Sequence, residues 1–312
     1  MKIAIIGAGM AGLACAEALS AAGHRVQVLD KGRGPGGRMS TRRTTTEAGE
    51  VSFDHGAQFF TVRDPAFAAR TQAWVADGVA APWPDAGPEA LVGVPGMNAP
   101  IRAMAQALDV TWQARVDEVV REGAGWHLSG EGFEALSADI LVVATPSEQA
   151  AILLATVAPD MAAKAAAVIS DPCWTVMAAF AEPLGLSDDV LREAGPLSWV
   201  ARNSAKPGRD GPEAFVLQAS PDWSRTHLED AADAVANALL AHLQAANGGA
   251  LPPVLSLQAH RWRYARTPAT GGPPLWSQAD QIGACGDWLG GARIEAAWRS
   301  GHDLAAAILA AR

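Results

Sequence analysis

The residues at positions 7–12 read Gly-Ala-Gly-Met-Ala-Gly, the composition and spacing of a turn that binds phosphate. Glycines allow a tight turn and let backbone N–H groups approach a pyrophosphate, and a helix that begins here adds a favourable dipole. Asp30 follows eighteen positions after Gly12, where an acid can accept hydrogen bonds from ribose hydroxyls. The pattern predicts a dinucleotide site rather than a structural glycine-rich turn. The turn residues expected at the pyrophosphate are Gly7, Gly9, Met10, Ala11 and Gly12.

A basic group follows the acid. Gly37 and Arg38 come seven and eight residues after Asp30, and Arg42 and Arg43 lie just beyond. A guanidinium is suited to bidentate binding of phosphate oxygens. Because Arg38 follows the ribose-binding acid so closely, we expect it at the dinucleotide. For Arg42 and Arg43, a solvated basic loop and a phosphate site remain equally open.

The elements around these residues form a β-α-β unit. Lys2–Ile6 reads as a buried strand, Ala11–Ala22 as a helix and Arg25–Asp30 as a second strand. Ile140–Ala144 is a fully apolar strand, and Ile294–Ala311 reads as a helix that closes the chain. The sequence therefore predicts an α/β domain with a parallel sheet, to which the end of the chain returns.

The region between about 150 and 275 has a different pattern of predicted strands, helices and turns. Thr175–Phe180, Ala214–Ala219 and Val254–Leu257 read as strands, and Lys206–Pro212 is a turn with clear helix and strand breakers. Arg38–Thr46 is polar and basic, and we assign it to no strand. A mixed sheet-and-helix region inserted into the α/β domain is the expected arrangement.

Composition limits the classes of function. The chain has 312 residues, of which 49% are apolar and 18% charged, so a large core is expected. Its net charge of -9 argues against nucleic acid or an anionic membrane as the main partner. No stretch approaches the ~20 apolar residues that span a bilayer. Cys15, Cys173 and Cys285 are widely spaced, which indicates a reducing, cytoplasmic environment, and no metal-ligand spacing is evident.

Three blocks of sequence carry a resemblance to a known family. They are Asp30-Lys31 with the Gly-Gly-Arg at 36–38, the run Asp-His-Gly-Ala-Gln-Phe-Phe-Thr at 54–61, and Gly286-Asp287 with the helix start at Ile294. Together they resemble the flavin amine oxidase branch of FAD-binding proteins. The resemblance implies non-covalent FAD with Arg38 at its pyrophosphate, segment 54–61 against the isoalloxazine, Asp287 at the ribityl phosphate and the helix start at the pyrimidine edge. The further cofactor residues that it implies are Lys31, Gly37, Gly56, Ala57, Gln58, Phe59, Val116, Gly286, Ile294 and Glu295.

Within this superfamily the chain is most similar to the bacterial renalases, through segments 54–61, 93–97 and 260–265. This likeness implies oxidation of the 2- and 6-dihydro isomers of NAD(P)H to NAD(P)+, with hydride transfer to FAD and reduction of O2 to H2O2. No catalytic side chain beyond the flavin is then expected. Candidates for the substrate pocket are His260, Arg261, Trp262 and Trp288, although His260 can equally be a core histidine.

Two other functions stay open. An FAD-dependent amine oxidase or desaturase would use the same cofactor scaffold, and a non-catalytic dinucleotide-binding protein would need only the turn and Asp30. The Trp-rich, Arg-containing stretch 260–299 favours a planar anionic substrate. Cys285 is better suited to core packing than to covalent flavin attachment.

The expected fold is α/β, with a Rossmann-like FAD-binding domain of the glutathione-reductase and amine-oxidase type and an inserted mixed α+β substrate domain. The ranges expected for the FAD-binding domain are 1–60, 93–150 and 276–312, and those for the substrate domain are 61–92 and 151–275.

Overall fold

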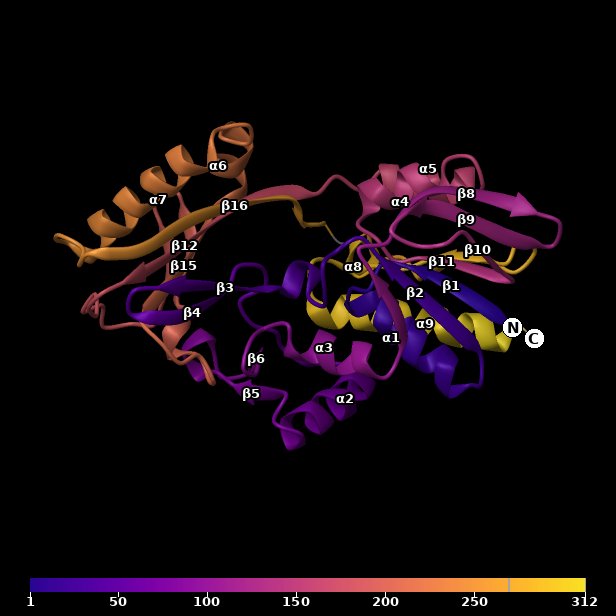
Figure 1. Cartoon of the computed structure of the whole chain (residues 1–312), viewed down its shortest axis with the longest axis horizontal. Helices are drawn as coiled ribbons and strands as arrows, with labels where there is room; N and C mark the ends of the chain where they lie inside the picture. The colour runs from indigo at the N-terminus through magenta and orange to yellow at the C-terminus, as the bar shows by residue number, and fades with distance from the viewer. Residues whose placement is uncertain (269, 312) are drawn as a thin grey trace.

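The protein has two lobes that are joined by long strands, as Figure 1 shows. The computed structural model describes residues 1–268 and 270–311. Ala269 and Arg312, which fall in the predicted substrate and FAD-binding ranges, lie outside the described residues.

The first lobe is built on a six-stranded sheet with the order β17-β18-β11-β1-β2-β7. All neighbouring strands are parallel except β17, which is antiparallel to β18. The C-terminal β18 pairs with β11, so the end of the chain returns to the N-terminal sheet as predicted. The bounds are β1 (Lys2–Ile6), β2 (Arg25–Asp30), β7 (Asp109–Trp112), β11 (Ile140–Val143), β17 (Leu275–Ser277) and β18 (Ile282–Ala284).

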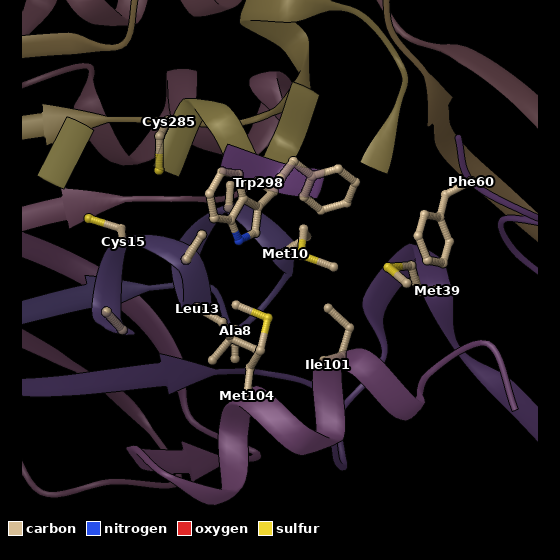
Figure 2. Packing of buried hydrophobic residues seen from close by; sticks show 14 of the residues in the cluster. Ala8, Met10, Leu13, Cys15, Met39, Phe60, Ile101, Met104, Cys285 and Trp298 are labelled. Atoms are coloured by element: carbon tan, nitrogen blue, oxygen red, sulfur yellow. The ribbon is translucent and has the colours of Figure 1, made fainter. Parts of the chain in front are cut away.

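Helices α1 (Met10–Ala21) and α9 (Ile294–Ala310) cross in backbone contact, because Gly301 has no side chain. A Cβ atom at Gly301 would lie 1.9 Å from the carbonyl oxygen of Ala11. Helices α2 (Pro65–Ala76) and α3 (Ala99–Gln106) join the same core, and Figure 2 shows Met10, Trp298 and Met104 within it. Segment 61–92, which we expected beside the substrate domain, packs Phe67 into this core cluster, and its Ala86 carbonyl accepts a hydrogen bond from Arg192 of the second lobe at 2.8 Å.

The other face of the six-stranded sheet is covered by a small sheet and two helices. Strands β8 (Arg115–Glu122), β9 (Gly125–Glu131) and β10 (Leu136–Ala138) form the small sheet. Helices α4 (Ser147–Leu154) and α5 (Pro159–Ala166) complete this layer. Their apolar side chains form a second core with alternate residues of β1 and β11.

The second lobe is a five-stranded antiparallel sheet with the order β13-β14-β15-β12-β16. Helices α6 and α7 cover one face, and the β3–β4 hairpin approaches the other (Figure 1). The bounds are β12 (Asp171–Phe180), β13 (Val190–Ala194), β14 (Leu197–Arg202), β15 (Glu213–Ala219), β16 (Val254–Arg266), α6 (Pro221–Thr226) and α7 (Ala232–Asn247). The remaining elements are β3 (Thr41–Thr46), β4 (Gly49–Asp54), β5 (Ala80–Pro82), β6 (Leu91–Gly93), α8 (Asp287–Gly290) and the short 3-10 turns at Gly37–Met39, Pro84–Ala86 and Asn203–Ala205.

The α/β fold with a Rossmann-like sheet is confirmed, but two segments differ from the expectation. Part of the polar stretch 38–46 is strand β3, whose threonines suit a pleated surface that is only half buried. The strand expected over Val254–Leu257 continues to Arg266 as β16, because it pairs with β12 along almost its whole length. Within residues 1–268 and 270–311, no helix is both long and apolar enough to cross a membrane.

Candidate functional site

A cavity of about 530 Å³ lies between the two lobes, a volume typical of sites for small molecules and cofactors. Its wall includes the turn after β1, the end of β11, segment 56–61, the start of α9 and one face of the second-lobe sheet. The predicted site residues that line it are Gly9, Met10, Ala11, Arg38, Gly56, Ala57, Gln58, Phe59, Trp262, Gly286, Asp287 and Ile294. Four further lining residues had no signal in the sequence: Thr145, Cys173, Trp199 and Gln218. Arg266 and Arg293 also line the cavity, and the sequence indicated them only as part of the Trp-rich, Arg-containing stretch 260–299.

The predicted ribose end lies just outside this cavity. Asp30 accepts hydrogen bonds from the backbone N–H groups of Ala8 and Gly32, both at 2.7 Å. Each carboxylate oxygen keeps a further lone pair, so the acid can still accept from a hydroxyl. The backbone N–H of Ala114 donates to the Asp30 carbonyl at 2.9 Å, which brings the strand of Val116 alongside. The predicted residues that do not line the cavity on this side are Gly7, Gly12, Asp30, Lys31, Gly37 and Val116.

Arg38 and Asp287 meet across 249 positions of sequence. Nη2 of Arg38 donates to Oδ1 of Asp287 at 2.7 Å, while Nη1 is buried and has no hydrogen-bond partner among the described residues. Thr145 Oγ1 is likewise buried without a partner in the described part of the chain. A Cβ at Gly9 would meet nothing within 4 Å. Unpaired donors, open space at the turn and the N-terminus of α1 fit a dinucleotide diphosphate.

Segment 54–58 is held in the cavity wall from behind. The side chains of Trp262 and Gln218 donate to the carbonyls of His55 (2.8 Å) and Gly56 (2.7 Å). The backbone N–H of Ala57 donates to the Arg38 carbonyl at 2.8 Å, and a Cβ at Gly56 would lie 2.0 Å from that oxygen. Glycine at this position therefore lets the segment approach the Arg38 loop, next to the predicted diphosphate site.

Two aromatic groups form a flat part of the wall. Phe59 and Trp199 stack with ring centroids 5.3 Å apart, and the guanidinium of Arg192 lies 4.2 Å from the Trp199 ring. Trp262 lines the cavity from β16. These rings could sandwich a planar ligand or contact an apolar chain.

Arg261 lies on the opposite face of β16 from Trp262, in contrast to our expectation. Its Nη1 donates to Glu229 Oε2 at 2.9 Å, and its guanidinium lies 5.5 Å from the ring of Trp174. Successive strand residues point to opposite faces, so Arg261 and Trp262 cannot both reach the cavity. Arg261 therefore takes part in an exposed ion pair with Glu229.

His260 shares a face with Trp262 but does not line the cavity. Its Nδ1 lies 3.4 Å from Arg42 Nη2, and its ring meets that of His55 edge-on at 5.0 Å. Burial, followed by the charge of Arg42, lowers the pKa of His260 to about 4. The ring is therefore uncharged at neutral pH and packs as part of a buried group.

Two other predicted residues serve packing or backbone contacts. Trp288 is 1% exposed, lies in the second core and does not line the cavity. Glu295 accepts hydrogen bonds from the backbone N–H groups of Arg63 (3.1 Å) and Asp64, which ties α9 to the start of α2. The sulfur of Cys285 is also buried in a core cluster, where burial raises its pKa to about 12.

A buried ionic cluster lies behind segment 54–58, and the sequence did not predict it. Asp54, Lys206 and Arg209 have side chains that are 0%, 0% and 1% exposed. Asp54 Oδ2 lies 3.3 Å from Lys206 Nζ and 2.5 Å from Arg209 Nη2. Burial raises the pKa of Asp54, but Lys206 and Arg209, with hydrogen bonds from Met97 and Thr41, lower it to about 2 overall.

The cavity wall carries an excess of positive charge. Its charged residues are Arg38, Arg266, Arg293 and Asp287, and the last is paired with Arg38. Arg266 ends β16 and Arg293 precedes α9, so they come from different lobes. Neither guanidinium makes an ion pair or hydrogen bond with another described residue. No group of three or more possible metal ligands occurs within the part of the chain that the structure describes.

Two protein-family models match the chain. Residues 5–71 match the NAD(P)-binding Rossmann-like domain, and residues 83–309 match flavin containing amine oxidoreductase. The L-amino-acid oxidase of Daboia russelii is 51% identical over 45 residues, which are 14% of this chain and 9% of that relative. The chain therefore matches only a small part of this relative's length.

Solved structures with the same fold cover almost the whole chain. A putative protoporphyrinogen oxidase from Exiguobacterium sp. 255-15 superposes with a TM-score of 0.78 at 12% identity, covering 100% of this chain and 99% of that one. Cyclohexylamine oxidase from Brevibacterium oxydans IH-35A gives 0.70 at 16% identity, covering 98% of each chain. A triple mutant of putrescine oxidase gives 0.73 at 15% identity, covering 100% and 99%. These similarities establish the fold.

Proposed function

The chain belongs to the family of flavin containing amine oxidoreductases, its cofactor is FAD, and from this premise we propose that it oxidises dihydronicotinamide dinucleotides. The proposed reaction is that of the bacterial renalases, in which the 2- and 6-dihydro isomers of NAD(P)H are returned to NAD(P)+. The proposal concerns the substrate, because a fold shared with oxidases of other compounds does not define one.

The charge of the cavity wall carries the proposal. Arg38 is paired with Asp287, which leaves Arg266 and Arg293 without a counter-charge among the described residues. A dinucleotide substrate brings a diphosphate that these two arginines can bind. An amine is a cation at neutral pH, and this wall would repel it. The positive wall also contrasts with the net charge of -9 on the whole chain.

The residues of the chain bind and orient rather than exchange protons. We assign Arg38, Asp287 and the turn at Gly9 to the cofactor, and Trp199 and Trp262 to the plane of the substrate ring. FAD, when bound, supplies the acceptor for a hydride and the route by which two electrons reach O2 as H2O2. A dihydropyridine is already a hydride donor, so the chain needs only to stack it and exclude water.

The proposed reaction needs no general base, and the histidines near the cavity do not line it. Neither His55 nor His260 lines the cavity, and burial lowers the pKa of each to about 4. Lys206 does not line the cavity either. Asp287 is the carboxylate in the cavity wall, and it is already paired with Arg38, so the proposed hydride transfer does not use it as a base.

An anaerobic comparison of substrates tests the proposal. The purified holoprotein is mixed with borohydride-reduced NAD+, which contains several dihydro isomers, and the visible absorbance of the flavin is followed. We expect fast bleaching that ordinary NADH does not reproduce and that air reverses. A panel of primary and secondary amines is the comparison, because the fold is shared with cyclohexylamine and putrescine oxidases. Bleaching by an amine, with no response to the reduced dinucleotide, would replace this proposal by amine oxidation.

A further inference from the structure

The cluster formed by Asp54, Lys206 and Arg209 contains more positive than negative charge. All three side chains are buried, and Asp54 is the only carboxylate that pairs with either cation among the described residues. Two cations and one anion leave an excess of one positive charge inside the protein. A buried charge is costly unless a counter-charge or hydrogen bonds compensate it, so the presence of this extra positive charge needs an explanation.

The two terminal nitrogens of Arg209 donate to Asp54 and to the backbone, whereas its Nε is buried without a partner among the described residues. Its Nη2 donates to Asp54 at 2.5 Å, and its Nη1 donates to the carbonyls of Gly93 and Pro207, both at 2.6 Å. The guanidinium and the carboxylate thus form a close pair. Thr41 Oγ1 also donates to Asp54 at 2.7 Å, so this carboxylate is well satisfied without the lysine.

Lys206 links the cluster to the cavity. Its Nζ lies 3.3 Å from Asp54 Oδ2 but donates to Gln58 Oε1 at 3.1 Å and sits 5.0 Å from the centre of the Trp83 ring. Gln58 lines the cavity, and its Nε2 donates to the carbonyls of Asp54 (2.6 Å) and Gly56 (2.9 Å). The ammonium therefore holds the orientation of the amide that fixes the cavity wall.

We propose that Lys206 is a positioning residue that acts through Gln58 to keep a positive potential behind segment 56–59 and so favours the reduced form of the bound FAD. This inference rests on the proposed function and on the placement of segment 54–61 against the flavin ring, which the family resemblance implies. A hydride brings two electrons and one proton, so its transfer adds one negative charge to the ring. A fixed cation in a low-dielectric wall stabilises that charge without any reorganisation.

The test is the two-electron potential of the bound FAD, measured against a redox dye at pH 7. Lys206→Met should lower the equilibrium constant for reduction about tenfold, which is about 30 mV for a two-electron couple. Lys206→Arg keeps the charge and should restore most of the potential. Lys164→Met is the matched control, because Lys164 is an exposed residue of α5, and it should leave the potential unchanged.

A potential in Lys206→Met equal to that of Lys164→Met would overturn the inference. Lys206→Met should fold, because Asp54 keeps Arg209 and Thr41 as partners. If Lys206→Met does not bind FAD, the second test is the two-electron potential of the wild-type FAD, measured as a function of pH. Burial, opposed by Asp54 and reinforced by Arg209, lowers the pKa of Lys206 to about 8.

The potential of the wild type should then fall more steeply with pH around that value, as the lysine loses its charge, and an unchanged slope would overturn the inference. The charged groups that face the ammonium are Asp54 and Arg209, with Gln58 and Trp83 as its uncharged neighbours. Neither measurement needs a substrate. The inference about Lys206 is therefore tested independently of the proposed dinucleotide oxidation.

Discussion

Asp54→Asn should lower the free energy of unfolding more than the substitution of a charged surface residue does. The carboxylate of Asp54 is fully buried between Lys206 and Arg209. The amide has nearly the same shape, so the change removes the negative charge and leaves the volume of the side chain in place. Two buried cations would then lie together with no counter-ion. The amide N–H₂ would also be a donor that faces the donors of Lys206 and Arg209.

The size of the effect follows from burial and pairing. Removal of one partner of a buried ion pair costs about 3–5 kcal/mol. The pKa of Asp54 gives a second figure, because its fall from 3.8 to about 2 corresponds to about 2 kcal/mol between the two protonation states. No reduction for solvent screening applies, because the carboxylate is 0% exposed. We therefore expect a loss of about 2–5 kcal/mol in the free energy of unfolding.

Urea unfolding at pH 7.5 with saturating FAD, followed by far-ultraviolet circular dichroism, measures the loss. Asp189→Asn is the matched control, because Asp189 pairs with Arg202 at 2.9 Å in a partly exposed position and Arg202 keeps Glu213 as a second partner. The control should lose no more than about 1 kcal/mol. Equal stability of the two variants would refute the claim that the buried cluster depends on its single carboxylate.

Three further predictions concern packing, the cofactor and acid. Gly301→Ala places a Cβ 1.9 Å from the Ala11 carbonyl oxygen, so it should lower the free energy of unfolding by about 1–3 kcal/mol in the same urea assay. The control is Gly249→Ala, whose Cβ meets nothing within 4 Å and which should change the stability little. Arg38→Met removes the buried Nη1 and the partner of Asp287, and titration of the apoprotein should show FAD bound at least ~10-fold more weakly; unchanged affinity would exclude Arg38 from the diphosphate site. Because the pKa of Asp54 is lowered to about 2 in the fold, its contribution is complete above about pH 4 and is lost as the pH falls through 2. The stability difference between the wild type and Asp54→Asn should shrink over that window, and a constant difference would contradict the assignment.

The dinucleotide-binding turn could be predicted because its signals are local. Gly7, Gly12 and Asp30 lie within one β-α-β unit, and each residue type has a backbone or hydrogen-bonding reason for its place. The C-terminal block around Asp287 was found only through family resemblance. Its ion pair with Arg38 joins residues 249 positions apart, a contact that no local pattern encodes.

The second lobe was harder to predict because face and burial depend on tertiary packing. Alternation along β16 puts either Arg261 or Trp262 in the cavity, and the sequence alone did not show which. Lys206 and Arg209 lie in a stretch of turn residues, which normally indicates a solvent-exposed loop. Their burial follows from Asp54, whose carboxylate lies about 150 positions earlier in the chain.

The central claim is that the cationic cavity wall selects an anionic hydride donor, and stopped-flow reduction of the flavin tests it most directly. Wild-type holoprotein and the double variant Arg266→Met/Arg293→Met are mixed anaerobically with increasing concentrations of borohydride-reduced NAD+. We predict an unchanged limiting rate and a half-saturating concentration raised at least ~10-fold in the variant, because each arginine binds charge remote from the reacting ring. Equal saturation of both proteins, or faster reduction of the wild type by an amine, would contradict the account.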